Sequence, residues 1–539
     1  MLDILIKSGC IVDGTGNSSY HGDLGIRDGK IVKIESNIDE EALEIIDATG
    51  LVVSPGFIDV HSHNDLVPYM EENIQNLKLM QGVTTELVGQ CGLGVVPCVE
   101  DENNLWKNYI RGVVGDPGFM WNFSNIDDYF NEISKNGLKN NFTALISHGA
   151  IRTSVMGFYS KTPTTEEIKS MCEIAESAMK SGAFGMSLGL QYLPGIFSTK
   201  DELIDICTVI AKYNGIVMIH LRNHDDTIIN ALEEIIYIAK QSKVRLHISH
   251  MRSYNSKDLG CDAEKLISYI ESAVAKGMKI TFDEHLYLSG STLMTQLLPP
   301  WVTAGGSPEM VKRLQDKEIV TTLKKELLSH TTHYAGWDNY SLITGWDGIL
   351  ITSVKEKSNL KYLGKTVGAI AKELGIEAVD FALQLLISEK FGVGVVTLDV
   401  FSEEDTIKLI NHPLQMVGSD SIPAGNPHPR LYGNYPLFIG KFVRDKNALT
   451  LEKAIYKISY LPAKTLGLKD IGEIAVGKTA DIVLFDLNEI MGFEDYFNPT
   501  KSPVGVKYVV LSGNVAVSDS MVCNDSYGKI IRSGLTCMM

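Results

Sequence analysis

Eight short apolar segments of the chain each end in a polar or reactive residue, and helical patterns separate them. Alternating strands and helices favour a parallel sheet, and eight buried strands of this kind are the plan of a closed (β/α)8 TIM-like barrel. Such barrels build their active sites at the carboxyl ends of the strands. An open doubly wound sheet is the alternative, but no G-x-G-x-x-G string follows a strand to support it. The strand-end residues are His61 with His63, Cys91, His148, Ser187, His220, His250, Asp283 and Asp420.

The two ends of the chain differ in pattern from its middle. Residues 1–53 and 470–539 contain short strands that break at Gly or Asp-Gly, which is a hairpin signal. Chain termini often lie close together, so we expect both ends to form one small β-sandwich domain; two unrelated β appendages are the alternative. The barrel domain would then occupy residues 54–469.

The last two barrel strands are far apart in the sequence. The segment of about 291–391 is longer than a normal crossover and contains helical patterns of its own. A long excursion from the active-site face is usually a lid or a binding loop, so we predict a lid-like insertion here. The clearest helix of the barrel follows Thr164, which can cap it, with Glu167 in the capping-box position and Gly182 after its end.

Composition excludes several kinds of partner. The 539 residues carry a formal net charge of -17, with a pI near 5.3, and such a chain repels phosphate backbones, so we expect no nucleic-acid partner. No apolar run approaches the roughly 20 residues that a spanning helix needs, and no signal-peptide pattern begins the chain. The eight cysteines are scattered without a C-x-x-C string or a disulfide framework, which suggests a reducing compartment. We therefore expect a cytoplasmic protein without a membrane partner.

The string His61-Ser62-His63 offers two imidazoles to one ion, because side chains at i and i+2 of a strand lie on the same face. An H-x-H string alone is a weak signal, but its place at the end of the first strand, with Asp65 after it, strengthens the interpretation. Two adjacent buried histidines need partners, and a cation supplies them.

His220 and His250 end two successive later strands. A lone strand-end histidine is more often structural, but two of them in a barrel that already offers H-x-H favour a metal site, and zinc accepts imidazole and thiolate well. Cys91, in VGQCGLG, could complete this set as a thiolate; a small buried hydrophobic residue is its alternative role. Asp420 ends the last strand, where it could ligate a metal and accept a proton from water; a turn or cap residue is the alternative. We expect it to lie across the barrel from the H-x-H string.

The order of these motifs resembles that of the N-acyl-D-amino-acid deacylases (D-aminoacylases) of the amidohydrolase superfamily. The resemblance covers residues from about 55 to about 445 and rests on GFIDVHSHND, VGQCGLGVVP, SLGLQYLPG, HLRN, ISHMR, the GST of LSGST, VGSDS and HPRLYGNYP. It implies a metallo-hydrolase barrel with a tight zinc held by Cys91, His220 and His250. It also implies a second, weaker metal position at His61, His63 and Asp420.

Substrate-contact positions depart from the family pattern. Arg252 stands where the family usually has a lysine that meets the substrate carboxylate, and His285 stands where it usually has a tyrosine, whereas Ser291 matches. Tyr192 and Arg222 are further candidates for substrate contact, with packing and a salt bridge as their alternative roles. These departures lie where the substrate would be bound and leave the predicted metal ligands unchanged.

These features predict zinc-dependent hydrolysis of N-acyl-D-amino acids to a carboxylate and a D-amino acid. Water activated by the metal would attack the amide, and Asp420 would act first as general base and then as general acid. The expected partner is the small-molecule N-acyl amino acid substrate; the sequence leaves the oligomeric state open.

The sequence disfavours three other functions. Hydantoinases and dihydroorotases use a carboxylated lysine at the end of strand four, whereas this strand ends around Ser187 with no lysine nearby. A deaminase of the P-C-x-x-C type is disfavoured because that string is absent: Pro97-Cys98 is followed by Val99 and Glu100 and then by no second cysteine. A non-catalytic barrel scaffold would typically have lost metal ligands, and this chain retains every expected one.

Overall fold

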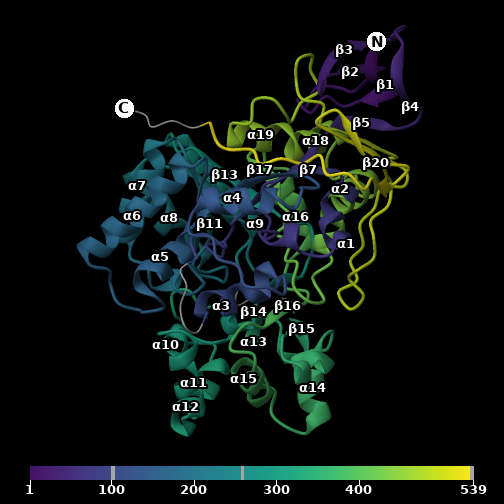
Figure 1. Cartoon of the computed structure of the whole chain (residues 1–539). Coiled ribbons are helices and arrows are strands. Elements are labelled where there is room, and N and C mark those ends of the chain that lie inside the picture. Colours follow the sequence, from purple (N-terminus) through teal and green to yellow (C-terminus); the bar gives the residue numbers. More distant parts are fainter. Residues whose placement is uncertain (99–103, 256–259, 535–539) are drawn as a thin grey trace.

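The computed structural model describes residues 1–98, 104–255 and 260–534. Within these residues, every predicted barrel strand forms, and the strands stand at the centre of the molecule (Figure 1). In chain order they are β6 (Phe57–Asp59), β7 (Val83–Val88), β8 (Asn141–Ala144) continued by β9 (Ile146–Ser147), β10 (Gly185–Gly189), β11 (Ile216–His220), β12 (Arg245–Ile248), β13 (Ile280–Glu284) and β17 (Gln415–Val417).

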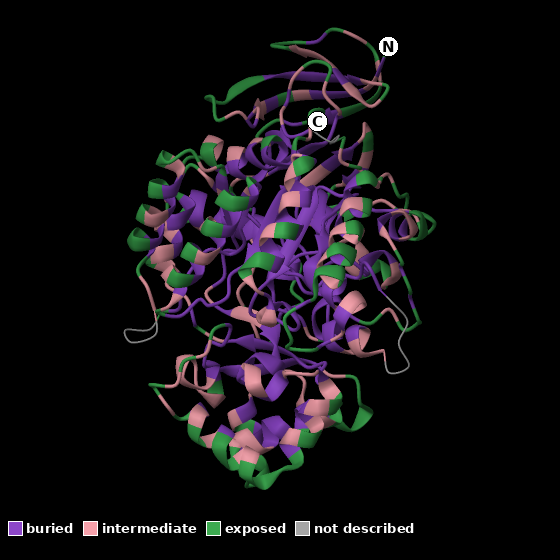
Figure 2. Ribbon diagram, turned by 90° about the vertical axis from the view of Figure 1, so that its left-hand side faces the viewer, coloured by how far each residue is buried: buried purple, intermediate pink, exposed green. Residues whose placement is uncertain are grey.

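The strands form a closed parallel ring. One run of parallel pairs joins β6, β7 and β8, and another joins β9, β10, β11, β12, β13 and β17. The last strand meets the first through a parallel bridge between Ser62 and Ser421, where the Asp420 N–H donates to the His61 carbonyl at 2.7 Å. The ring is buried and helices with exposed outer faces surround it (Figure 2). The predicted α/β barrel is therefore confirmed.

Helices cover the outside of the barrel between its strands. In α7, the buried residues Leu203, Ile206, Cys207 and Ile210 recur at helical spacing and face the strands. The predicted capping box begins α6, with the Thr164 side chain accepting from the Glu167 N–H. The covering helices are α2 (Leu77–Met80), α3 (Leu105–Val114), α4 (Ile126–Ser134), α5 (His148–Met156), α6 (Thr165–Lys180), α7 (Lys200–Lys212), α8 (Ile228–Ser242), α9 (Ala263–Ala275), α16 (Glu403–Ile410), α17 (Arg430–Leu437), α18 (Leu451–Ile458) and α19 (Tyr460–Leu466).

Both ends of the chain contribute to one β sheet, as predicted. β5 (Val52–Pro55) pairs antiparallel with β18 (Ile482–Phe485), and this pair joins the N-terminal strands to the C-terminal ones. The N-terminal strands are β1 (Leu2–Ile11), β2 (Tyr20–Arg27), β3 (Lys30–Glu35) and β4 (Ala42–Asp47), and the C-terminal strands are β19 (Val506–Leu511), β20 (Asn514–Ser518) and β21 (Met521–Val522). Residues beyond this sheet return to the barrel, where the Phe142 N–H donates to the Lys529 carbonyl at 2.9 Å. Residues 535–539 lie outside the described residues.

The segment between β13 and β17 forms a separate lobe at the end of the barrel away from the terminal sheet (Figure 1). Its core is an antiparallel sheet in which β16 (Gly394–Thr397) lies between β14 (Gly290–Leu293) and β15 (Ile349–Ser353). Its helices are α10 (Pro300–Thr303), α11 (Ser307–Gln315), α12 (Lys317–Leu327), α13 (Tyr340–Ile343), α14 (Val367–Leu374) and α15 (Ala378–Ser388). We call this lobe the insertion.

Candidate active site

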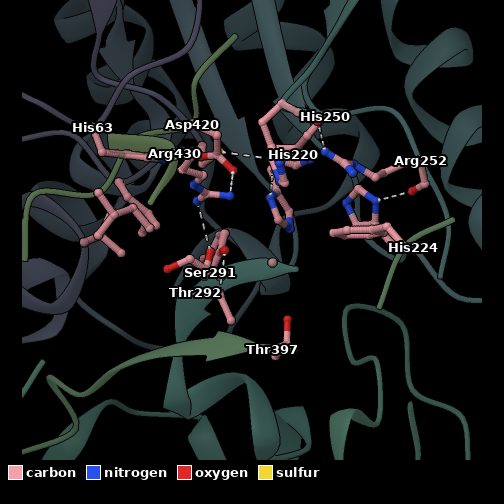
Figure 3. A pocket seen from close by; sticks show the side chains of 18 of the residues that line it. His63, His220, His224, His250, Arg252, Ser291, Thr292, Thr397, Asp420 and Arg430 are labelled. Atoms are coloured by element: carbon pink, nitrogen blue, oxygen red, sulfur yellow. Dashed lines mark hydrogen bonds and ion pairs between the residues drawn. The ribbon is translucent and has the colours of Figure 1, made fainter. Parts of the chain in front are cut away.

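A cavity lies between the carboxyl ends of the barrel strands and the β14–β16 edge of the insertion (Figure 3). The barrel supplies imidazole, thiol, carboxylate and guanidinium groups, and the insertion supplies hydroxyl groups. The barrel residues include His63, Cys91, His220, His250, Arg252 and Asp420, and the insertion residues with hydroxyl groups include Ser291, Thr292 and Thr397.

One candidate metal group consists of Cys91, His220 and His250, whose ligand atoms all lie within 4.8 Å of one another. The His220 Nδ1 atom is 3.0 Å from the His250 Nε2 atom, which is 3.6 Å from the Cys91 sulfur. All three residues are buried. The structure thus brings together the three residues that the sequence predicted for the tight zinc.

A second candidate group consists of His61, His63, Cys91 and Asp420, again with ligand atoms within 4.8 Å of one another. The Cys91 sulfur is 3.3 Å from His61 Nε2, so one thiol belongs to both groups and could bridge two ions. Asp420 Oδ1 lies 3.3 Å from Nε2 of both His61 and His63. Asp420 therefore lies beside the H-x-H string and not across the barrel, because ring closure makes the last strand the neighbour of the first.

Sharp backbone turns aim these side chains at the cavity. Cys91, His250 and Asp420 all have positive φ angles of 53°, 33° and 49°, a region that side-chain-bearing residues seldom adopt and that costs on the order of 1–3 kcal/mol each. Next to Cys91, a Cβ on Gly92 would lie 2.8 Å from the Gly189 backbone nitrogen, so this position requires glycine. The strand ends thus hold strained conformations that serve the cavity.

Asp283 orients the His61 ring. Its Oδ2 atom is 3.1 Å from His61 Nδ1 and 2.8 Å from His247 Nε2, and its Oδ1 atom accepts from the His250 N–H at 2.8 Å. Burial raises the pKa of Asp283, but the neighbouring His61 and His247 lower it more, so the net pKa lies well below the ordinary value. An ionised Asp283 accepts the Nδ1 proton of His61 and leaves Nε2 free to ligate a metal.

Arg430 holds Asp420 on the side opposite the histidines. Its Nη1 atom is 3.0 Å from Asp420 Oδ2. Burial raises the pKa of Asp420, but Arg430 first and then His61 lower it, and the net pKa lies well below the ordinary value. Asp420 is therefore an ionised carboxylate in contact with His61 and His63.

The donor set fits zinc. Thiolate and imidazole are the ligands that zinc prefers, and an aspartate is accepted beside them. Burial raises the pKa of the Cys91 thiol to about 11, so a cation in direct contact is what would stabilise its thiolate in this position. The ring nitrogens of His220 and His250 that face each other at 3.0 Å are close enough for one ion to bind both.

The predicted substrate contacts fall in two places. Arg252, His285, Ser291 and Tyr192 line the cavity, and the Tyr192 hydroxyl lies 2.7 Å from the Thr292 hydroxyl. Arg222 does not reach the cavity, because its Nε and Nη2 atoms bind Glu234 and its Nη1 donates to the Ile196 carbonyl. The structure therefore places Arg222 in the salt bridge that was its alternative role.

Arg252 is already engaged by protein groups. Its Nε atom is 2.9 Å from Glu284 Oε2, its Nη atoms donate to the carbonyls of His285 and Tyr287, and the Phe401 ring lies 4.1 Å from its Cζ. Burial raises the pKa of Glu284 to about 8, so Glu284 only partly neutralises the guanidinium at neutral pH. A positive charge therefore remains available beside the cavity.

Two functional residues escaped the sequence analysis. Arg430 lies within HPRLYGNYP and Gln191 within SLGLQYLPG, so both stood in quoted motifs. Neither residue stands at the end of an apolar segment, which is the signal that marked the other candidates. Only the fold shows that Arg430 binds Asp420 and that Gln191 binds His220 at 2.8 Å.

Comparison with known proteins agrees with this geometry. The sequence profile of the amidohydrolase family matches residues 44–323 and 392–517. The chain belongs to the amidohydrolase family. The match skips residues 324–391, which lie within the insertion of this amidohydrolase.

Full-length relatives of this amidohydrolase include deacylases. It is 28% identical to a D-aminoacylase of Alcaligenes xylosoxydans xylosoxydans over 530 residues, covering 98% of this chain and 97% of the relative. A solved N-acyl-D-glutamate deacylase from Bordetella bronchiseptica, complexed with zinc and a phosphonate mimic of the tetrahedral intermediate, is 27% identical with a TM-score of 0.83, over 99% and 100% of the two chains. A D-aminoacylase structure from work on its binuclear metal centre is 25% identical, also with a TM-score of 0.83 and the same coverage.

The lining of the cavity bears on the hydantoinase and dihydroorotase alternative. Among the described residues, no lysine lines the cavity, and Ser187 on β10 donates its hydroxyl to the Gly89 carbonyl. This lining does not fit the carboxylated-lysine site of the hydantoinase and dihydroorotase alternative. No helix in the described parts of the chain is long and apolar enough to cross a membrane.

Proposed function

We propose that this amidohydrolase hydrolyses the amide bond of N-acyl-D-amino acids and releases a carboxylic acid and a D-amino acid. The single observation that carries the proposal is the thiol of Cys91, which belongs to two groups of candidate ligands, with the ionised Asp420 in the group that contains His61 and His63. The likeness over the whole chain to proteins named D-aminoacylase and N-acyl-D-glutamate deacylase supports the choice of substrate.

Cys91, His220 and His250 would hold a tight zinc, and His61, His63 and Asp420 a weaker second metal. A zinc ion in this position supplies a Lewis acid that lowers the pKa of water and polarises a carbonyl. The buried ligands and the walls of the cavity exclude bulk water, so the charges within it act at short range in a medium of low polarity.

Asp420 would move the proton. Because its pKa is held low, it is ionised at neutral pH and can take a proton from the attacking water as the water oxygen bonds to the acyl carbon. It then gives this proton to the amide nitrogen as the carbon–nitrogen bond breaks, which releases a neutral amine. Arg430 keeps the carboxylate oriented through both steps.

Arg252 would bind the carboxylate of the substrate, with Ser291 and His285 beside it. The remaining guanidinium N–H groups can meet a carboxylate, and the half-buried Ser291 offers a hydroxyl from the insertion. A cationic anchor at this place favours an amide that carries a free carboxylate over one that does not.

Hydrolysis of paired N-acetyl-D- and N-acetyl-L-amino acids by zinc-loaded protein tests the proposal. We expect release of acetate from the D series, with kcat/KM at least about 100-fold above that for the L series, since a misplaced reacting bond costs about this factor. Dihydrouracil and hydantoin serve as the cyclic-amide control. Activity confined to the L series or to the cyclic amides would contradict it.

A further inference from the structure

A buried chain of hydrogen bonds runs from the insertion to His220. Nε2 of His220 lies 2.8 Å from Gln191 Oε1, and Gln191 Nε2 donates to Asp338 Oδ2 at 2.7 Å. Asp338 belongs to the insertion and its side chain is fully buried, and Gln191 is buried as well. The Nδ1 atom on the other side of the His220 ring faces His250.

The direction of these hydrogen bonds follows from donors that cannot be reversed. The His224 backbone N–H donates to Asp338 Oδ2 at 3.0 Å. Asn223 Oδ1 accepts from the Gly336 backbone N–H, so the Asn223 amide nitrogen must be the atom that donates to Asp338 Oδ1 at 2.9 Å. Both Asp338 oxygens thus accept, which is the pattern of an ionised carboxylate. Burial raises the pKa of Asp338 above its ordinary value, and these hydrogen bonds oppose that rise.

The orientation of Gln191 and the tautomer of His220 follow in turn. Since Asp338 accepts, Gln191 must present its NH2 group to Asp338 and its oxygen to His220. The oxygen can only accept, so His220 carries its proton on Nε2 and has a lone pair on Nδ1. This is the atom that faces the candidate metal position.

We infer that Asp338 and Gln191 are positioning residues that fix His220 as a metal ligand, and that the insertion therefore determines metal affinity as well as enclosing the cavity. This inference rests on the proposed metal site. Outer hydrogen bonds to ligating histidines set the tautomer and ring orientation, and their loss typically lowers metal affinity about 10- to 100-fold.

The environment of Asp338 supports a dedicated role. In addition to Gln191, Asn223 and His224, the Tyr254 hydroxyl donates to Asp338 Oδ2 at 3.0 Å. This one insertion residue therefore binds groups that follow β10, β11 and β12, three successive barrel strands. A residue that only covered the cavity would not need hydrogen bonds to the segments that follow three barrel strands.

The test measures zinc affinity by chelator competition on purified, zinc-loaded protein, without any substrate. We expect Gln191→Leu to weaken zinc binding at the tight position about 10- to 100-fold. Asp338→Asn, which keeps the size of the side chain, should weaken it in the same direction by a smaller factor. Tyr254→Phe is the matched control, because it removes one donor to Asp338 and leaves the Asp338–Gln191–His220 chain intact; its zinc affinity should match that of the unaltered protein.

Unfolding temperatures of the same variants, measured with zinc removed, separate positioning from general stability. Lower unfolding temperatures in Gln191→Leu and Asp338→Asn, together with unchanged zinc affinity, would overturn the inference. Equal loss of affinity in Tyr254→Phe would overturn it also, since that variant keeps the chain. Absence of tight zinc from the unaltered protein would contradict the proposed metal site itself, whereas absence of deacylase activity with tight zinc would contradict only the proposed reaction.

Discussion

Asp420 shows at the scale of a single residue how neighbouring charges set a chemical role. It is buried, which alone would favour the neutral acid, yet Arg430 and His61 outweigh burial and keep it ionised. The same carboxylate contacts both histidines of the H-x-H string. A proton acceptor is thus placed directly beside the position where a metal would activate water.

Asp420→Asn should lower kcat about 10²- to 10⁴-fold, because asparagine has nearly the same shape and cannot accept a proton. Zinc at the position of Cys91, His220 and His250 should remain. The measurement is kcat on an N-acetyl-D-amino acid together with the zinc content of the purified variant. A variant that keeps its zinc and more than about a tenth of the activity would refute the role of Asp420 as the base.

Arg252→Met should remove discrimination in favour of substrates with a free carboxylate. We expect kcat/KM for the N-acetyl-D-amino acid to fall about 10- to 100-fold, the worth of a charged hydrogen bond, while that for the matching carboxamide changes little. Because Arg252 is paired with Glu284, the double variant Arg252→Met/Glu284→Gln controls for an unpaired buried acid. Equal losses for the acid and the carboxamide would instead indicate a purely structural Arg252.

The sequence predicted the candidate metal ligands and the candidate base, and it missed the residues that contact them through hydrogen bonds. His220 ends an apolar strand, and Cys91 and His250 follow two others within three residues, so the barrel plan alone brings these positions together. Gln191 and Asp338 carry no such signal, because their role depends on a hydrogen bond across 147 positions of the chain. Arg222 matched a family motif, but its local salt bridge with Glu234 keeps it away from the cavity.

At the scale of secondary-structure elements, a buried lysine lies where α18 packs against β17. Lys457 on α18 is buried, and its amine donates to the carbonyls of His412 and Gln415 at 2.6 and 3.2 Å. Burial first, and then repulsion by Lys453, lower the pKa of Lys457 from 10.5 to about 7. The helix is therefore anchored to the start of the last barrel strand by a group that holds its proton weakly.

The Lys457→Met variant should differ from the unaltered protein in the pH dependence of its stability. Between pH 7 and 10.5 the unfolded chain keeps the Lys457 proton and the folded chain does not, so folding stability rises with pH in this window; below pH 7 the full cost of the buried charge is present. From pH 7.5 to 9, the free energy of unfolding of the unaltered protein should gain up to about 1.4 kcal/mol per pH unit relative to the variant. Denaturant unfolding at both pH values measures this, and parallel pH profiles would show that Lys457 is not responsible.

The plan of the whole molecule was predictable, but the internal arrangement of the insertion was not. Alternating strands and helices predict the barrel, and similar β patterns at both chain ends predict the shared sheet. The insertion was expected to be lid-like from its length alone. Residues of β14 line the cavity, and Asp338 accepts a hydrogen bond from Gln191. Both features depend on long-range packing, which local sequence patterns do not encode.

X-ray absorption at the zinc edge of the purified, zinc-loaded protein tests the central claim most directly, because it measures the atoms bound to the ion. We predict sulfur at about 2.3 Å and imidazole nitrogen at about 2.0–2.1 Å, with the sulfur signal lost in Cys91→Ser. Stoichiometric zinc with only nitrogen and oxygen neighbours in the unaltered protein would contradict the claim that Cys91, His220 and His250 form one metal site.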